Sequence, residues 1–234
     1  MSRHLFRFKQ FSVLQEKSAM KIGTDGVLLG AWANAKNPKK ILDIGTGTGL
    51  ILLMLAQRFP QTKLTGIEIN ENAFTEAWFN ISESVFKERC SVIHSSLQEF
   101  NSEEKFDLIV SNPPFFEFTH KENSARNTAR QQSDLSFEDL ISHAEKLLSS
   151  NGKFAVVIPF ESENHFVKLS IKLNLFPEKI TRVKGNENAD FKRSLMLFSR
   201  KQLEIEMDEL IIEISRNIYT ADYISLTKDF YLKM

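Results

Sequence analysis

The feature that most constrains the fold is a strand-like run that breaks into a glycine-rich bend. Ile41–Ile44 is apolar apart from Asp43, and the bend Gly45-Thr46-Gly47-Thr48-Gly49 follows it directly. From Leu50 to Phe59 the sequence continues with the pattern of an apolar helix. Glycines that alternate with small hydroxyl residues let the chain turn sharply and leave backbone N–H groups unobstructed. The pattern therefore predicts a ligand site where a strand ends and a helix begins.

The order of the elements predicts the fold class. Strand-like runs alternate with helix-like runs from Lys40 to Ser199. Such alternation is typical of α/β proteins, in which a mostly parallel sheet carries helices on both faces and binds ligands at the carboxyl ends of its strands. The bend has G-x-G-x-G spacing, not the G-x-G-x-x-G of nicotinamide dinucleotide sites. It resembles the first motif of class I methyltransferases that use S-adenosylmethionine. The resemblance implies a Rossmann-like, mostly parallel seven-stranded sheet with an antiparallel last strand.

Two later strand ends supply candidate contacts for a nucleoside. Lys63–Glu68 is predicted as a second buried strand that ends in an acid, where nucleotide-binding folds place a carboxylate on ribose hydroxyls. A solvated acid at a strand end is the alternative interpretation of Glu68. Ser91–His94 is predicted as a third strand, and Ser96 follows it. Many relatives of this fold carry an acid near that position to bind an adenine amine, and a serine hydroxyl accepts the same hydrogen bond more weakly.

The fourth predicted strand, Phe106–Val110, runs into Ser111-Asn112-Pro113-Pro114-Phe115. Two consecutive prolines have no N–H groups and leave only carbonyl acceptors. An exocyclic amine held here would donate hydrogen bonds to the Asn112 side chain and the Pro113 carbonyl while its ring stacked on Phe115. The alternative is a proline-rich turn with buried phenylalanines. Since Gly45–Gly49, Glu68 and Asn112–Phe115 all follow strands, we expect one cleft to contain all three.

Met20–Ala33, Ile41–Leu50 and Ser111–Phe116 together resemble the bacterial tRNA (adenine-N6) methyltransferases that modify the adenine beside the anticodon of a valine tRNA. The arm at Phe8–Phe11 and the closing Leu226–Leu232 are also similar to that family, so the resemblance covers essentially the whole chain. It implies N6-methylation of adenine 37 by direct transfer of the sulfonium methyl group of S-adenosylmethionine.

The resemblance also implies a set of site residues. The predicted catalytic residues are Asn112, Pro113, Pro114 and Phe115, the last standing where tyrosine is common but keeping an aromatic face. The predicted cofactor-binding residues are Lys21, Thr24, Asp43, Gly45, Thr46, Gly47, Gly49, Glu68, Ile69, Ser96, Leu97 and Asn112. No two histidines have ligand spacing, so we expect no metal.

Other activities remain open from the residues alone. A protein-glutamine N5-methyltransferase presents a similar amide nitrogen, but such enzymes usually carry a long helical N-terminal domain. Guanine-N2 methylation of rRNA is a second alternative, because related enzymes have Asn-Pro-Pro-Phe. DNA adenine methylation usually needs a target-recognition insert, and none is evident. A non-catalytic RNA-binding module is the alternative from a different class.

Charge and composition restrict the partners. The 30 Lys and Arg residues balance the 30 Asp and Glu residues, so any affinity for nucleic acid must come from a local patch. The basic excess between His165 and Lys201 is the best candidate for a tRNA footprint, and a solvated face is its alternative. Glu117–Leu135, with Lys121, Arg126 and Arg130, is either a lid or phosphate grip over the site or a solvated loop.

We expect one methyltransferase domain over residues 1–234. It divides into an N-terminal arm and helix at 1–39, with Thr24 or Asp25 as the helix N-cap, a catalytic core at 40–200 and a C-terminal extension at 201–234, whose aromatic residues we expect to pack. The single cysteine excludes an intramolecular disulfide, and the sequence shows neither a signal peptide nor a run of membrane-spanning length. These features predict a cytoplasmic monomer without membrane contact.

Overall fold

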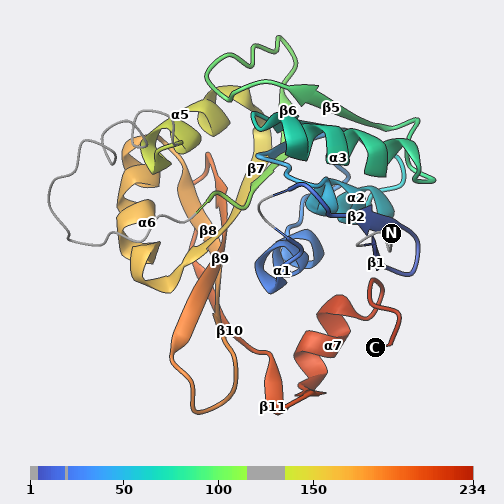
Figure 1. Cartoon of the computed structure of the whole chain (residues 1–234). Coiled ribbons are helices and arrows are strands. Elements are labelled where there is room, and N and C mark those ends of the chain that lie inside the picture. Colours follow the sequence, from blue (N-terminus) through green and yellow to red (C-terminus); the bar gives the residue numbers. More distant parts are fainter. Residues whose placement is uncertain (1–4, 19–20, 115–134, 234) are drawn as a thin grey trace, which may run out of the picture.

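The computed structural model describes residues 5–18, 21–114 and 135–233. These residues form one central sheet with helices packed around it (Figure 1). Five strands run parallel in the order β5-β4-β3-β6-β7. Their bounds are β3 Lys40–Ile44, β4 Lys63–Glu68, β5 Cys90–His94, β6 Phe106–Ser111 and β7 Leu148–Pro159. Next to β7 lies β9 (Phe191–Ser199), which is antiparallel both to β7 and to β8 (Phe176–Lys184). These seven strands confirm the predicted mostly parallel sheet with an antiparallel last strand.

The sheet has an eighth strand that corrects the predicted count of seven. β10 (Glu206–Ile211) pairs in parallel with the outer edge of β8. Its acidic sequence, EMDELI, is unlike that of a strand, because Asp and Glu are depleted in strands. Lys179 of β8 lies opposite Glu206 and forms ion pairs with both Glu206 and Asp208. A cation on the neighbouring strand thus compensates for the acids.

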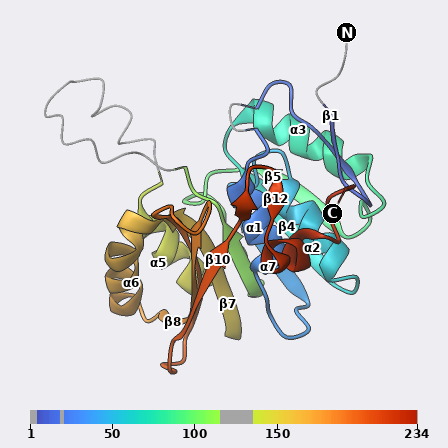
Figure 2. The ribbon, with the colours of Figure 1, turned by 90° about the horizontal axis from the view of Figure 1, so that it is seen from below.

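Helices cover both faces of the sheet (Figure 2). On one face, α1 (Thr24–Trp32), α2 (Leu50–Arg58) and α7 (Ala221–Thr227) pack with Leu108 and Val110 of β6 into one buried cluster. On the other, α5 (Phe137–Leu147) and α6 (Glu163–Lys172) pack with Ile109 of β6 into a second cluster. Successive residues of β6 thus point to opposite faces of the sheet, and the predicted helices on both faces are confirmed. The remaining helix, α3 (Glu71–Ser82), lies against β5 and against the N-terminal arm.

The N-terminal arm and the C-terminal extension meet. The arm is an antiparallel pair, β1 (Leu5–Arg7) and β2 (Ser12–Leu14). The extension contains the short strands β11 (Glu213–Ser215) and β12 (Ile218–Tyr219) before α7. The Lys9 amide donates to the Phe230 carbonyl at 2.8 Å, and the Phe8 and Tyr231 ring centroids are 5.8 Å apart. The two ends of the chain therefore support each other.

The start of α1 differs from the prediction. Gly23, not Thr24 or Asp25, is the N-cap, and no side chain caps the helix. Asp25 accepts a hydrogen bond from Arg193 Nε of β9 at 2.7 Å, so its carboxylate is turned to a distant cation instead of to its own helix. None of the helices in the described part of the chain is long and apolar enough to cross a membrane.

Candidate active site

The three predicted strand ends lie at one edge of the sheet. In the register of the sheet, Ile44 of β3 is opposite Ile67 of β4 on one side and Ser111 of β6 on the other. The Ser111 hydroxyl donates to the Ile44 carbonyl at 2.9 Å, which ties β6 to the end of β3. The glycine bend, Glu68 and Asn112 follow these positions directly, so the structure brings them to neighbouring strands about 5 Å apart.

The glycine bend uses backbone conformations that favour glycine. Gly45, Gly47 and Gly49 all have positive φ, at 68°, 57° and 82°. A Cβ added at Gly45 or Gly47 would meet nothing within 4 Å among the described residues, which leave the space beside these two glycines open. At Gly49 a Cβ would lie 3.6 Å from Ala77 of α3, so that end of the bend packs against a helix. The open part of the bend is a cradle for a ligand.

The expectation that the backbone N–H groups of the bend are free is wrong for four of them. The amides of Gly45 and Thr46 both donate to the Ile67 carbonyl at 3.0 Å, and the Gly49 amide donates to the Thr46 carbonyl. The Gly47 amide donates to Glu68 Oε2 at 2.9 Å. The bend can therefore accommodate a ligand by its shape, but four of its N–H groups already donate within the protein. A pyrophosphate, which needs several free N–H groups, does not suit it.

Two carboxylates lie at the bend. Asp43 is fully buried, and its Oδ2 accepts a hydrogen bond from the Thr46 hydroxyl at 2.6 Å. Burial raises the pKa of Asp43 to about 7; the Thr46 hydrogen bond lowers this pKa, and the charge of Glu68 raises it. Asp43 Oδ1 has no hydrogen-bond partner within the described part of the chain. No ion pair joins either acid to a cation among the described residues, and two acids without such a partner favour a positively charged ligand over an anionic one.

Glu68 keeps acceptor capacity for a diol. Its two oxygens accept one backbone hydrogen bond each, from Gly47 at 2.9 Å and from Asn70 at 2.8 Å. A carboxylate has about four acceptor positions, so each oxygen retains about one. The backbone bonds also fix the orientation of the side chain. Glu68 is therefore set to accept two hydroxyl hydrogens at once, as a ribose requires.

Asn112 has an acceptor atom that nothing within residues 5–18, 21–114 or 135–233 satisfies. Its Oδ1 is buried and unpaired. Most buried polar side-chain atoms in proteins have a partner, and an unpaired one indicates a bound water or ligand. Pro113 is buried and Pro114 is exposed, and neither can donate a backbone hydrogen bond. Phe115 and all of the predicted lid, Glu117–Leu135, except Leu135 lie outside the described residues.

The remaining predicted cofactor contacts lie around the same edge with differing exposure. Ile69 is 63 % exposed beyond Glu68, whereas the Leu97 side chain is buried in the second core cluster. A contact from Leu97 would therefore have to come from its backbone. Lys21 and Thr24 are exposed just before and at the start of α1. Gly26 of that helix packs on Leu50, the first residue after the bend, because a Cβ at Gly26 would lie 3.2 Å from the Leu50 side chain.

Two features near Ser96 were missed from the sequence. The Ser96 hydroxyl donates to Glu99 Oε2 at 2.9 Å and accepts from the Glu99 amide at 3.2 Å, so a carboxylate stands beside the serine. The Ser-x-x-Glu spacing, which is that of a capping box, was the available signal. His94 stacks on Phe74 with ring centroids 5.1 Å apart, and its Nε2 lies 2.9 Å from the Ile69 carbonyl oxygen. The stack packs residues of α3 and β5 beside the predicted nucleoside contacts.

Ion pairs neutralise part of the basic excess between residues 165 and 201. Five of its cations form ion pairs with carboxylates, namely Lys179, Arg182, Lys184, Arg193 and Arg200. Arg182 makes three hydrogen bonds to the buried Glu163, which also accepts from Ser194. Paired charges contribute little to the attraction of phosphates. These pairs support the structural alternative for five of the cations, and the tRNA footprint stays a prediction. Within the described residues no group of His, Cys, Asp and Glu is arranged to hold a metal ion.

Comparisons with known proteins agree on one chemistry. The family profile described as "Methyltransferase small domain" matches residues 17–184. A Flavobacterium johnsoniae protein called tRNA1(Val) (adenine(37)-N6)-methyltransferase is 52 % identical over 235 residues, which is 98 % of this chain and 100 % of that protein. A Christiangramia forsetii protein of the same name is 48 % identical over 240 residues and covers 100 % of both chains.

The fold is similar to that of solved methyltransferases. The crystal structure of an Agrobacterium tumefaciens protein titled a predicted O-methyltransferase superimposes with a TM-score of 0.69 over 88 % of this chain and 96 % of that one. The two sequences are only 18 % identical, so this likeness concerns the fold alone.

Proposed function

The chain belongs to the family of tRNA1(Val) (adenine(37)-N6)-methyltransferases, within the methyltransferase small-domain proteins, and on this premise we propose that it methylates N6 of adenine 37 in a valine tRNA. Identity of 52 % over 98 % of the chain supports the same substrate. The observation that carries the proposal is the unpaired Oδ1 of Asn112 beside the open glycine bend.

The residues fit S-adenosylmethionine. When bound, this cofactor would supply an electrophilic methyl group on a sulfonium sulfur. Transfer of that methyl group to adenine N6 would leave neutral S-adenosylhomocysteine and release one N6 proton to water. The bend provides open space, Glu68 retains two acceptor positions for the ribose, and Asp43 and Glu68 make the site negative for a cation. The occupied N–H groups of the bend support this choice over a dinucleotide.

Asn112 and Pro113 hold the acceptor nitrogen in this proposal. The lone pair of adenine N6 is delocalised into the ring, which makes it a poor nucleophile. Hydrogen bonds from N6–H to Asn112 Oδ1 and to the Pro113 carbonyl favour a pyramidal nitrogen that points at the methyl group. Orientation of this kind can supply about 7–11 kcal/mol of the barrier. Phe115 is proposed as the stacking face for the adenine, and Pro114 as the rigid link that presents it.

The substrate position suits such a site. Bases in a tRNA loop can be unstacked and inserted into a pocket, whereas bases in a duplex cannot without being flipped. A tRNA substrate also supports the predicted cytoplasmic location. The predicted monomer remains to be checked by light scattering with and without tRNA.

The decisive experiment is methyl transfer to defined RNAs. We expect labelled methyl groups from S-adenosylmethionine to appear in a valine tRNA transcript as N6-methyladenosine, and not in the same transcript with guanine at position 37. Total rRNA, genomic DNA and a protein extract are the parallel substrates. Label in rRNA as N2-methylguanosine, or in protein as N5-methylglutamine, would overturn the proposal. Binding of S-adenosylmethionine with no transfer to any of these would favour the RNA-binding module.

A further inference from the structure

Two polar side chains of α3, outside the site described so far, hold the segment that leads from the arm to Lys21 and Thr24. We call the described parts of this segment, residues 14–18 and 21–23, the strap. Glu76 is only 4 % exposed, and its carboxylate accepts three backbone hydrogen bonds from the strap. Oε1 accepts from the amides of Glu16 and Lys17 at 2.6 and 2.5 Å, and Oε2 accepts from Ser18 at 2.9 Å. Such bonds to a charged acceptor are about twice as strong as neutral ones.

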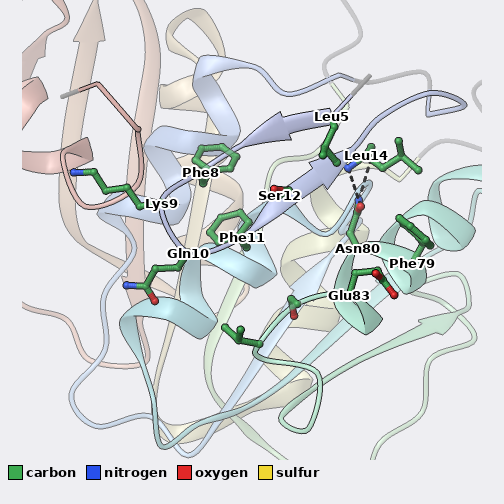
Figure 3. A pocket seen from close by; sticks show the side chains of 12 residues that line it. Leu5, Phe8, Lys9, Gln10, Phe11, Ser12, Leu14, Phe79, Asn80 and Glu83 are labelled. Carbon is green, nitrogen blue, oxygen red and sulfur yellow. Dashed lines mark hydrogen bonds between the residues drawn. The ribbon is translucent and has the colours of Figure 1, made fainter. Parts of the chain in front are cut away.

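Asn80, one helical turn further along α3, links the strap to the glycine bend. Its Oδ1 accepts from the Leu14 amide at 2.8 Å, and its Nδ2 donates to the Leu14 carbonyl at 3.0 Å (Figure 3). The same Nδ2 donates to the Thr48 carbonyl of the bend at 2.9 Å. Asn80 is 2 % exposed, and its bond to Thr48 is buried, whereas its two bonds to Leu14 are part-buried. The start of the strap is thereby fixed to the end of the bend.

The contact between the arm and α3 is hollow beside these hydrogen bonds. A cavity of about 450 Å³ lies between them, lined by the arm residues Leu5, Phe8 and Phe11 and by Phe79 and Asn80 of α3 (Figure 3). A hollow contact contributes less packing energy than a filled one. The fixed position of the strap therefore depends on the Glu76 and Asn80 hydrogen bonds.

Both ends of the strap flank the bend. Leu14 is tied to Thr48 through Asn80, and α1, which follows the strap, packs Gly26 on Leu50. Gln15 Oε1 accepts from the Ile22 amide at 2.7 Å and closes the strap on itself. Glu76 is one turn nearer than Asn80 to the start of α3 at Glu71, which follows the Glu68 end of β4. Its carboxylate fixes residues 16–18, which lie in the sequence between the two anchored ends of the strap.

We propose that Glu76 is a positioning residue for the cofactor, acting through the strap to set Lys21 and Thr24 beside the glycine bend. The inference rests on the proposed function, since it assumes that the bend binds S-adenosylmethionine. Glu76 does not touch the reacting atoms, so it acts on binding of the cofactor and not on the methyl-transfer step. Within the described residues, the hydrogen bonds of the Glu76 carboxylate all come from the backbone of residues 16–18, so its effect on the strap can be tested separately.

Three variants of the full chain test the proposal. Glu76→Ala removes all three acceptor positions, whereas Glu76→Gln keeps the one oxygen that can accept from Glu16 and Lys17. Ile81→Val, a buried change on the same helix away from the strap, is the control for a general loss of stability. The measurements are calorimetric affinity for S-adenosylhomocysteine, amide hydrogen exchange of residues 16–18 in the ligand-free protein, and kcat and KM for S-adenosylmethionine.

We expect Glu76→Ala to weaken S-adenosylhomocysteine binding by about tenfold or more and to speed exchange at residues 16–18, with kcat at saturation nearly unchanged. Glu76→Gln should recover part of the affinity, and Ile81→Val should bind as the wild type does. Wild-type affinity in Glu76→Ala, or an equal loss in Ile81→Val, would overturn the inference and leave the proposed function intact. If the wild-type protein itself did not bind S-adenosylhomocysteine, the proposed function would fail as well.

Discussion

Asp43 and Asn112 each retain a buried oxygen without a partner among the described residues, and they lie under and beside the same bend. An unsatisfied buried acceptor costs about 1–3 kcal/mol, so two in one site indicate that a ligand completes their hydrogen bonding or charge. At the residue scale these two side chains give the most direct tests of the site.

The pKa of Asp43, about 7, predicts a pH dependence that differs between two cofactor forms. A bound sulfonium cation favours the ionised carboxylate, so below pH 7 its binding must displace a proton, and affinity falls as the pH falls. Between about pH 6 and pH 8, we expect the affinity for S-adenosylmethionine to rise more steeply with pH than the affinity for S-adenosylhomocysteine, whose sulfur is neutral. The two slopes should differ by up to tenfold in affinity per pH unit. Calorimetry measures both slopes. Asp43→Asn should abolish the difference, and parallel slopes in the wild type would contradict the assignment.

Asn112→Ala should separate chemistry from cofactor binding. Loss of Oδ1 removes the proposed acceptor for N6–H, and we expect kcat to fall by about a hundredfold or more, the usual effect of deleting one aligned polar contact to the reacting group. Affinity for S-adenosylhomocysteine should change little. Asn112→Asp keeps an acceptor oxygen and is expected to retain part of the turnover. Equal loss of binding and turnover in the alanine variant would refute this role.

The sequence predicted the positions of the candidate residues in the fold better than their hydrogen bonding and pKa. Glu68 and Asn112 were placed at strand ends because hydrophobic runs mark where buried strands stop. The occupied N–H groups of Gly45 and Thr46 were not foreseen, since the carbonyl that accepts them belongs to Ile67 of another strand. The raised pKa of Asp43 likewise depends on burial beneath elements distant in the sequence.

At the scale of elements, β4 supports the bend through a glycine. A Cβ at Gly66 would lie 2.9 Å from the Thr46 side chain, which is buried and hydrogen-bonded to Asp43. We expect Gly66→Ala to lower the free energy of unfolding by about 1–3 kcal/mol through overpacking. It should also weaken cofactor binding, because Thr46 must move. Urea denaturation and calorimetry measure the two effects.

The matched control for this prediction is Gly185→Ala. Gly185 has open space around an added Cβ and no positive φ, so its substitution should leave both quantities unchanged. If Gly66→Ala bound S-adenosylhomocysteine as the wild type does, with unchanged stability, the support of the bend by β4 would be wrong.

Elements whose own sequence carries a signal, such as a capping residue, were predictable. Elements that are stabilised by residues far away in the sequence were not. Asn70 caps α3 by accepting from the Ala73 amide, and Ser136 caps α5 by accepting from the Asp139 amide, as their short side chains favour. β10 escaped prediction because Lys179, which compensates for its acids, lies on β8. The predicted N-cap of α1 was wrong because Asp25 pairs with Arg193, 168 residues away in the sequence.

At the scale of the whole molecule, the arm and the extension belong to the same buried cluster as the core helices. Phe8, Leu52 and Phe230 are all members of it, and the predicted packing of the closing aromatics is confirmed by the burial of Tyr223 and Phe230. The division into one domain with three parts stays a prediction that unfolding experiments address.

Phe230→Ala tests whether the ends of the chain unfold with the core. Phe230 is 2 % exposed, and we expect its truncation to cost about 3–5 kcal/mol. Urea denaturation should show one transition in the wild type and in the variant, with the variant's midpoint lower. Leu232→Ala, at a residue 57 % exposed, should lie within about 0.5 kcal/mol of wild type. A separate early transition for the arm and the extension would contradict a single domain.

The pair of acids at the bend also bears on how the proposed methyltransferase would release its product cofactor. S-adenosylhomocysteine has a neutral sulfur, so Asp43 and Glu68 would attract it less strongly than they would the sulfonium of S-adenosylmethionine. A site of this kind would distinguish S-adenosylmethionine from S-adenosylhomocysteine by charge. It would limit product inhibition in a cell where both compounds compete for the same place.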